Sequence, residues 1–189
     1  MNRKKELENA AQNMEEELFA SQYRRLEKEY RNKELRCKAV EAFSQIFSLA
    51  ADKQKELSWL GICYLHTSLT TGSHEILLSL YNKEFYFDPA PVEMYWRPPC
   101  FFDCFEEDME SVMKGLRSQF PRIWGYEEEF VRRFCVEYYY AATHQLCIDL
   151  AGEIMGTEAF RKAAKAENFT AFFGRYQGEG EILWRIKEA

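Results

Sequence analysis

Residues 57–88 decide how this chain is expected to fold, and they read LSWLGICYLHTSLTTGSHEILLSLYNKEFYFD. Two runs in this stretch, 57–67 and 76–81, contain the apolar and aromatic residues that strands favour, and a turn-forming sequence around Gly72 separates them. A short polar turn then leads into the aromatic run 85–87. The stretch therefore predicts an antiparallel β-meander of about three strands.

Helical periodicity dominates both sides of the meander. Residues 1–33 are dense in charge and predict an amphipathic helix that can project from the core. The apolar positions at its start are Leu7, Ala11, Met14 and Leu18. Residues 103–189 predict a helical region, in which a long helix over 126–155 has the widest apolar arc. For residues 181–186 at its end, a strand and the end of a helix are both open. We expect a mostly helical α+β protein, a single domain over 1–189, with the meander packed against this central helix.

The composition narrows the class of protein. A length of 189 residues and an aromatic fraction of 16% are typical of a chain that buries a core, whereas a net charge of −6 disfavours a general nucleic-acid binder. A basic protein partner fits the acidic charge better. The basic residues near the N-terminus are followed by polar ones, and no apolar run is long enough to cross a membrane. We therefore expect a cytoplasmic protein whose six cysteines are reduced.

The segment 89–100 is the strongest candidate for a recognition surface. Four of the five prolines lie between residues 89 and 99, which predicts an irregular loop. At its centre, Tyr95, Trp96 and Arg97 are the residue types that most often anchor protein interfaces. The alternative is that the loop covers the meander and Trp96 fills the edge of the core.

No reaction chemistry can be assigned from the sequence. Four residues could be combined into a metal site, but their spacing lacks the usual tight knuckles, and unligated buried cysteines are commoner. These residues are Cys100, Cys104, His144 and Cys147. No nucleophile elbow, phosphate-binding glycine motif or catalytic dyad is recognisable. We therefore predict no catalytic residue, no metal and no cofactor, and favour a binding protein over an enzyme.

Three functional hypotheses follow. The first is a protein-interaction module that binds or restrains a partner through Tyr95, Trp96 and Arg97. The second is a small-molecule-binding protein or enzyme with a pocket between the meander and the central helix, because tyrosines often give such pockets their polar groups. The residues expected to line that pocket are Tyr64, Tyr81, Tyr138, Tyr140 and His144. The third is a structural subunit that self-associates through residues 1–33.

Overall fold

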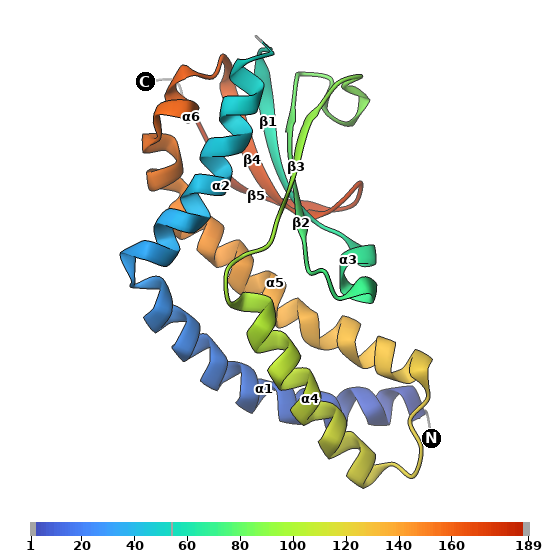
Figure 1. Ribbon diagram of the computed structural model, residues 1–189. Coiled ribbons are helices and arrows are strands. Elements are labelled where there is room, and N and C mark those ends of the chain that lie inside the picture. Colours follow the sequence, from blue (N-terminus) through green and yellow to red (C-terminus); the bar gives the residue numbers. More distant parts are fainter. Residues whose placement is uncertain (1–2, 54, 187–189) are drawn as a thin grey trace. The chain divides into compact units, whose positions relative to one another are not determined.

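The computed structural model describes residues 3–53 and 55–186 (Figure 1). In chain order its elements are α1 (Arg3–Tyr30), α2 (Lys33–Ala51), β1 (Leu57–Tyr64), α3 (His66–Thr71), β2 (Ile76–Tyr81), the 3-10 helix η1 (Phe85–Phe87), β3 (Val92–Trp96), α4 (Phe101–Gln119), α5 (Gly125–Gly156), α6 (Glu158–Lys162), β4 (Lys165–Arg175) and β5 (Gly180–Arg185). They form two compact units. The helical unit comprises Met1–Asn32 and Pro99–Thr143, and the sheet unit comprises Lys33–Pro98 and His144–Ala189.

The helical unit is built from α1, α4 and the first part of α5. In α4, apolar residues recur at three- and four-residue steps and form one buried face. The members of this face include Phe102, Phe105, Met109, Val112 and Leu116. The α1 helix packs against α4 through a stripe with a four-residue step that includes Leu7 and Ala11. Ring contacts between α1 and α5, such as Phe19 with Tyr139 at 5.2 Å, complete this core.

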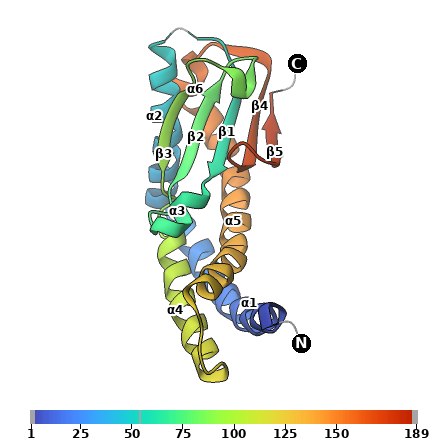
Figure 2. The same ribbon diagram turned by 90° about the vertical axis from the view of Figure 1, so that its right-hand side faces the viewer.

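The sheet unit contains a five-stranded sheet in the order β3-β2-β1-β4-β5 (Figure 2). Neighbouring strands are antiparallel except for the central pair β1 and β4, which is parallel. The α2 helix packs on β2, β3 and α6. The two ends of the sheet are therefore β3 and β5, and an edge strand has backbone groups on its outer side that no strand pairs.

The two faces of the sheet have different cores. On the face covered by α2, Phe47 contacts the rings of Phe160 and Phe169. On the opposite face, a second apolar cluster is covered by η1 and by residues near the β4–β5 turn. Its buried members are Cys63, Leu77, Tyr81 and Phe172, and Trp59, Leu65, Phe85, Tyr86 and Tyr176 pack against them. Both faces of the central strands are buried, which explains their nearly continuous apolar sequence.

The α+β class, the predominance of helix and the long helix are confirmed, since α5 has 32 residues. The sheet prediction was imprecise: the first two strands fall within the expected runs, but the sheet is mixed and has five strands. The expected strand at 85–87 is the 3-10 helix η1, in which Phe85 has a φ of 57° that is incompatible with an extended strand. The organisation as a single domain stays a prediction.

The other three strands of the sheet are β3, β4 and β5. No strand was predicted where β3 and β4 lie, whereas for residues 181–186, which overlap β5, a strand and the end of a helix were both open. The third strand of the meander, β3, lies inside the segment 89–100, which was expected to be an irregular loop. Its prolines flank the strand instead of interrupting it, as proline requires. In the region 103–189, which was expected to be helical, β4 and β5 form an antiparallel pair. Pairing with the central strand β1 decides the conformation of β4, and this long-range contact has no local signal in the sequence.

Candidate functional site on the edge strand

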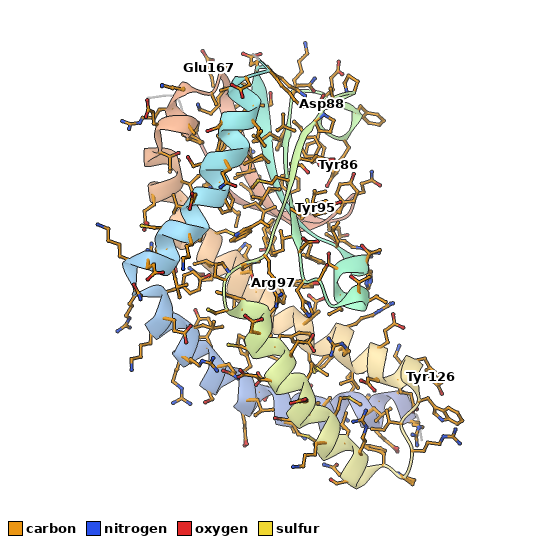
Figure 3. All side chains as sticks on the ribbon, in the orientation of Figure 1. Tyr86, Asp88, Tyr95, Arg97, Tyr126 and Glu167 are labelled. Atoms are coloured by element: carbon orange, nitrogen blue, oxygen red, sulfur yellow. The ribbon has the colours of Figure 1, made fainter. Side chains whose placement is uncertain are left out.

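The edge strand β3 presents alternate side chains to the core and to the surface. Val92 and Trp96 are buried, whereas Glu93 and Tyr95 are exposed. The ring of Trp96 meets that of Phe43 edge to face, with centroids 5.1 Å apart, and only 5% of Trp96 is exposed. Tyr95, labelled in Figure 3, is 62% exposed. Trp96 therefore fixes the strand to the core, and Tyr95 is the aromatic side chain that a partner can reach.

The chain that precedes β3 is held by Asp88. Its carboxylate accepts hydrogen bonds from the backbone N–H of Asn82 at 2.8 Å and of Ala90 at 3.0 Å, and it forms an ion pair with Lys55. Burial raises the pKa of Asp88, but the Lys55 ammonium and the two backbone donors outweigh it and hold that pKa below its ordinary value. The amine of Lys55 also donates to the Ala90 carbonyl at 2.7 Å. These contacts hold the backbone at the start of the edge strand.

A shallow groove runs between α2 and β3. It is lined by Glu41, Ser44, Gln45, Ser48, Leu49, Asp52 and Met94. Leu49 is 47% exposed, so the groove offers apolar surface. The charged residues in this lining are both acidic, and Glu93 adds a third carboxylate on the opposite face of β3. The exposed edge is therefore flanked by apolar groups and negative charge on one side, and by Tyr95 and Glu93 on the other.

The residues of the predicted pocket are distributed over both units. Tyr64 and His144 lie in the sheet unit, and the ring of each contacts that of Phe173, at centroid distances of 5.9 and 5.6 Å. Tyr81 lies on the opposite face of the sheet, in the cluster around Cys63. Tyr138 and Tyr140 belong to the helical unit. The small-molecule pocket stays a prediction.

The four candidate metal ligands are also divided. Cys100 and Cys104 lie at the start of α4 in the helical unit, and His144 and Cys147 lie in the sheet unit. His144 Nε2 is 3.5 Å from Glu181 Oε2, and Cys147 is fully buried. Across residues 3–53 and 55–186, no group of three or more His, Cys, Asp or Glu side chains is placed to hold a metal ion.

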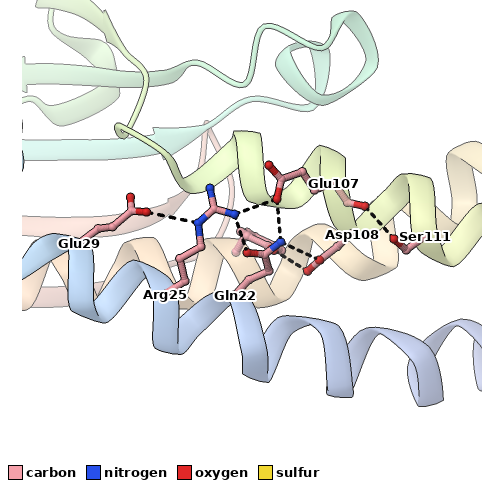
Figure 4. Close-up of polar contacts among 7 residues, drawn as sticks. Gln22, Arg25, Glu29, Glu107, Asp108 and Ser111 are labelled. Atoms are coloured by element: carbon pink, nitrogen blue, oxygen red, sulfur yellow. Dashed lines mark hydrogen bonds and ion pairs between the residues drawn. The ribbon is translucent and has the colours of Figure 1, made fainter.

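The helical unit contains two buried carboxylates that were not predicted from the sequence. Asp108 is 1% exposed, accepts from Tyr139 Oη at 2.6 Å and accepts from Gln22 Nε2 at 3.2 Å (Figure 4). Glu15 is completely buried, and neither of its carboxylate oxygens has a hydrogen-bond partner among residues 3–53 and 55–186. Burial and the nearby Asp108 carboxylate raise the pKa of Glu15 to about 8. Glu15 is therefore protonated at neutral pH.

The position of Glu15 follows from the period of α1. The buried stripe steps by four residues through Leu7 and Ala11 to Glu15, whereas the stripe predicted from the sequence continues from Ala11 to Met14. Outside this core, Arg25 pairs with Glu107 at 2.9 Å and ties α1 to α4 at the surface of the unit (Figure 4). Because Glu15 and Asp108 are enclosed, their ionisation affects the stability of the unit.

Comparisons with models of protein families, with curated proteins and with solved structures found no match. No helix in the described part of the chain is long and apolar enough to cross a membrane.

Proposed function

We propose that this protein is an interaction module that binds an extended, basic segment of a partner protein along the outer edge of β3. The observation that carries the proposal is the end position of β3 in the sheet, with Tyr95 exposed beside it. A strand added to such an edge gains main-chain hydrogen bonds, and its alternate side chains enter surfaces on either side. This mode of binding requires no reaction chemistry.

The charge around the edge supports a basic partner. Alternate side chains of an added strand would face the groove that contains Leu49, Glu41 and Asp52. The other set would face Tyr95 and Glu93, both exposed on the opposite side of β3. Lys and Arg have long apolar stems and a charged end, so they suit a surface that combines apolar area with carboxylates.

The three residues expected at the interface then have different roles. Tyr95 contacts the partner directly, because its amphipathic ring is exposed next to unpaired backbone groups. Arg97 follows the strand and is exposed, and it contacts the end of the bound segment. Trp96 acts indirectly, since its ring is buried against Phe43 and holds the strand in place.

We further place this module in the cytoplasm. All six cysteines are free thiols, four of them buried, and this state suits a reducing compartment. The partner segment would then belong to a cytoplasmic protein. A measurement of the protein's distribution in fractionated cells tests this assignment.

Binding is tested with labelled peptides of alternating Lys and Val residues, by fluorescence anisotropy. Tyr95→Ala is expected to raise the Kd at least about tenfold, because it removes an aromatic side chain that the partner would bury on binding. Phe87→Ala is the matched control, since Phe87 is 88% exposed but lies outside the strand. A peptide whose alternate backbone nitrogens are methylated should lose binding, because it cannot complete the strand ladder.

Two results would contradict the proposal. Equal binding of the methylated and unmodified peptides would exclude strand addition. Equal Kd values for the wild type, Tyr95→Ala and Arg97→Ala, with folding confirmed by circular dichroism, would remove the edge from the function.

A further inference from the structure

The connection between α4 and α5, residues 120–124, carries an exposed aromatic and cationic surface. Trp124 is 44% exposed, and Tyr126 in the first turn of α5 is 70% exposed (Figure 3). The guanidinium carbon of Arg122 lies 3.6 Å from the centroid of the Trp124 ring. Trp, Tyr and Arg are the residue types that dominate binding energy at protein interfaces. Here all three are accessible, unlike the buried Trp96.

The backbone of this connection is held in place. Glu127 accepts a hydrogen bond from the backbone N–H of Trp124 at 2.9 Å, and its other oxygen lies 2.5 Å from Arg3 Nε. Arg3 also donates to the carbonyl oxygen of Arg122. The aromatic and cationic side chains therefore extend from a fixed frame. A partner that binds them loses little conformational entropy in ordering the loop.

Arg122 supplies the cation of this loop. The three carboxylates that follow the loop are each neutralised by a cation, and the pairs are Arg3–Glu127, Arg117–Glu128 and Arg133–Glu129. Within the described residues, Arg122 has no carboxylate in ion-pair range, and its side-chain contact is the Trp124 ring. The Arg122 guanidinium, stacked on the Trp124 ring, the indole N–H of Trp124 and the phenol O–H of Tyr126 are all hydrogen-bond donors. Carboxylate oxygens are the acceptors that match them best.

We propose that Arg122, Trp124 and Tyr126 form a second interaction surface, which binds an acidic segment of a partner protein. Arg122 pairs with a carboxylate of that segment while the two rings bury its apolar stems. An anionic lipid surface fits less well, since the chain as a whole carries a net charge of −6 and would be repelled. This surface lies in the helical unit, and its charge preference is opposite to that proposed for β3. The proposal for this surface does not depend on the function proposed for β3.

The test measures anisotropy of labelled peptides of alternating Glu and Ala, or of Glu and Tyr, with the full chain. Trp124→Ala is expected to raise the Kd at least about tenfold, and Arg122→Glu to raise it further, because it reverses the charge. Arg117→Ala is the matched cation control, since Arg117 is paired with Glu128. Tyr23→Ala controls for loss of an exposed ring in the same unit. Both controls should stay within about twofold of the wild type.

Three results would overturn the proposal. The first is that the wild type binds none of the Glu peptides. The second is that Arg117→Ala or Tyr23→Ala weakens binding as much as Trp124→Ala does. The third is that phosphatidylserine vesicles, and not the Glu peptides, bind in a manner that depends on Trp124. Peptides in which Lys replaces Glu should bind alike to the wild type and to Arg122→Ala.

Discussion

The cores of the two units differ in the surroundings of the carboxylates that they bury. The helical unit encloses Glu15, whose carboxyl oxygens have no hydrogen-bond partner in the described residues, and Asp108 beside it. The buried carboxylate of the sheet unit, Asp88, is instead ion-paired with Lys55, and the large rings at its centre, such as Trp96 and Phe43, are apolar. A buried carboxylate loses its hydration and shifts its pKa, but a buried ring has nothing to titrate. The stability of the helical unit should therefore depend on pH near neutrality through Glu15, whose pKa is raised, whereas Asp88 in the sheet unit has a lowered pKa and titrates only in acid.

The largest expected effect is on the sheet unit. Trp96→Ala should lower the free energy of unfolding by about 3–5 kcal/mol, because it leaves a cavity against Phe43. Urea unfolding at pH 5 and at pH 8 should give the same loss, since the change removes no ionisable group. Hydrogen exchange of the backbone amides shows in which unit protection is lost. A loss of protection confined to the helical unit would contradict the assignment of Trp96 to the core of the sheet unit.

The second prediction concerns Glu15. Its folded-state pKa, about 8, lies above the ordinary value of 4.5, so between these values the folded state holds a proton that the unfolded chain has released. The contribution to stability is therefore fully present below pH 4.5 and is lost as the pH rises to about 8. Glu15→Leu should remove this dependence and stabilise the protein at pH 8 by about 1–3 kcal/mol, because no unpaired polar group remains.

Glu15→Gln is the matched variant for this test. It has the size of Glu15 but does not titrate, so it should also flatten the pH dependence, while it keeps polar atoms without partners in the core. Urea unfolding between pH 5 and pH 8 compares the three proteins. An identical slope of stability against pH in the wild type and in Glu15→Gln would contradict the assigned titration.

The third prediction concerns Asp108, the other buried carboxylate of the helical unit, and uses the variant Tyr139→Phe. It removes the hydroxyl that donates to Asp108 at 2.6 Å, and should cost about 1–2 kcal/mol. Because that hydrogen bond lowers the pKa of Asp108, the same change should raise this pKa further. Urea unfolding measures the cost, and carboxyl NMR of labelled Asp measures the titration. A downward shift of the Asp108 pKa would show that Tyr139 is not its donor.

The smallest expected effect is at the proposed interface. Tyr95→Ala should change the free energy of unfolding by no more than about 0.5 kcal/mol, because most of this side chain is exposed. Thermal unfolding at pH 7 provides the measurement. A larger loss would mean that Tyr95 supports the fold, and its effect on peptide binding could then not be assigned to the surface.

Local patterns in the sequence predicted those elements whose hydrophobic period is long and uninterrupted, such as the buried face of α4 and the length of α5. The alternation of Val92, Met94 and Trp96 is also visible, but the surrounding prolines were interpreted as evidence for a loop. The parallel partner of β1 could not be predicted. Which strand pairs with β1 depends on a contact between residues roughly a hundred positions apart, and no local propensity encodes that contact.

The candidate surfaces were harder to predict than the elements. Trp96 and Trp124 each lie within two residues of an arginine, yet only the second is exposed. Their difference comes from register: Trp96 is on the inward face of a strand, whereas Trp124 is in the loop that precedes α5. Glu15 is buried because the buried stripe of α1 continues four residues beyond Ala11, whereas a step of three residues would reach Met14. One residue's shift on a helix changes which side chain the core receives.

The central place of β1 beside β4 also determines when the sheet can be completed during synthesis. The ribosome must make the chain from Tyr64 to Arg175 before the two strands can pair along their length. At typical elongation rates this takes roughly 5–20 s. Throughout that interval the apolar strand β1 has one unpaired side, which is the kind of surface that aggregates. The nascent chain should therefore depend on chaperones more than its length suggests.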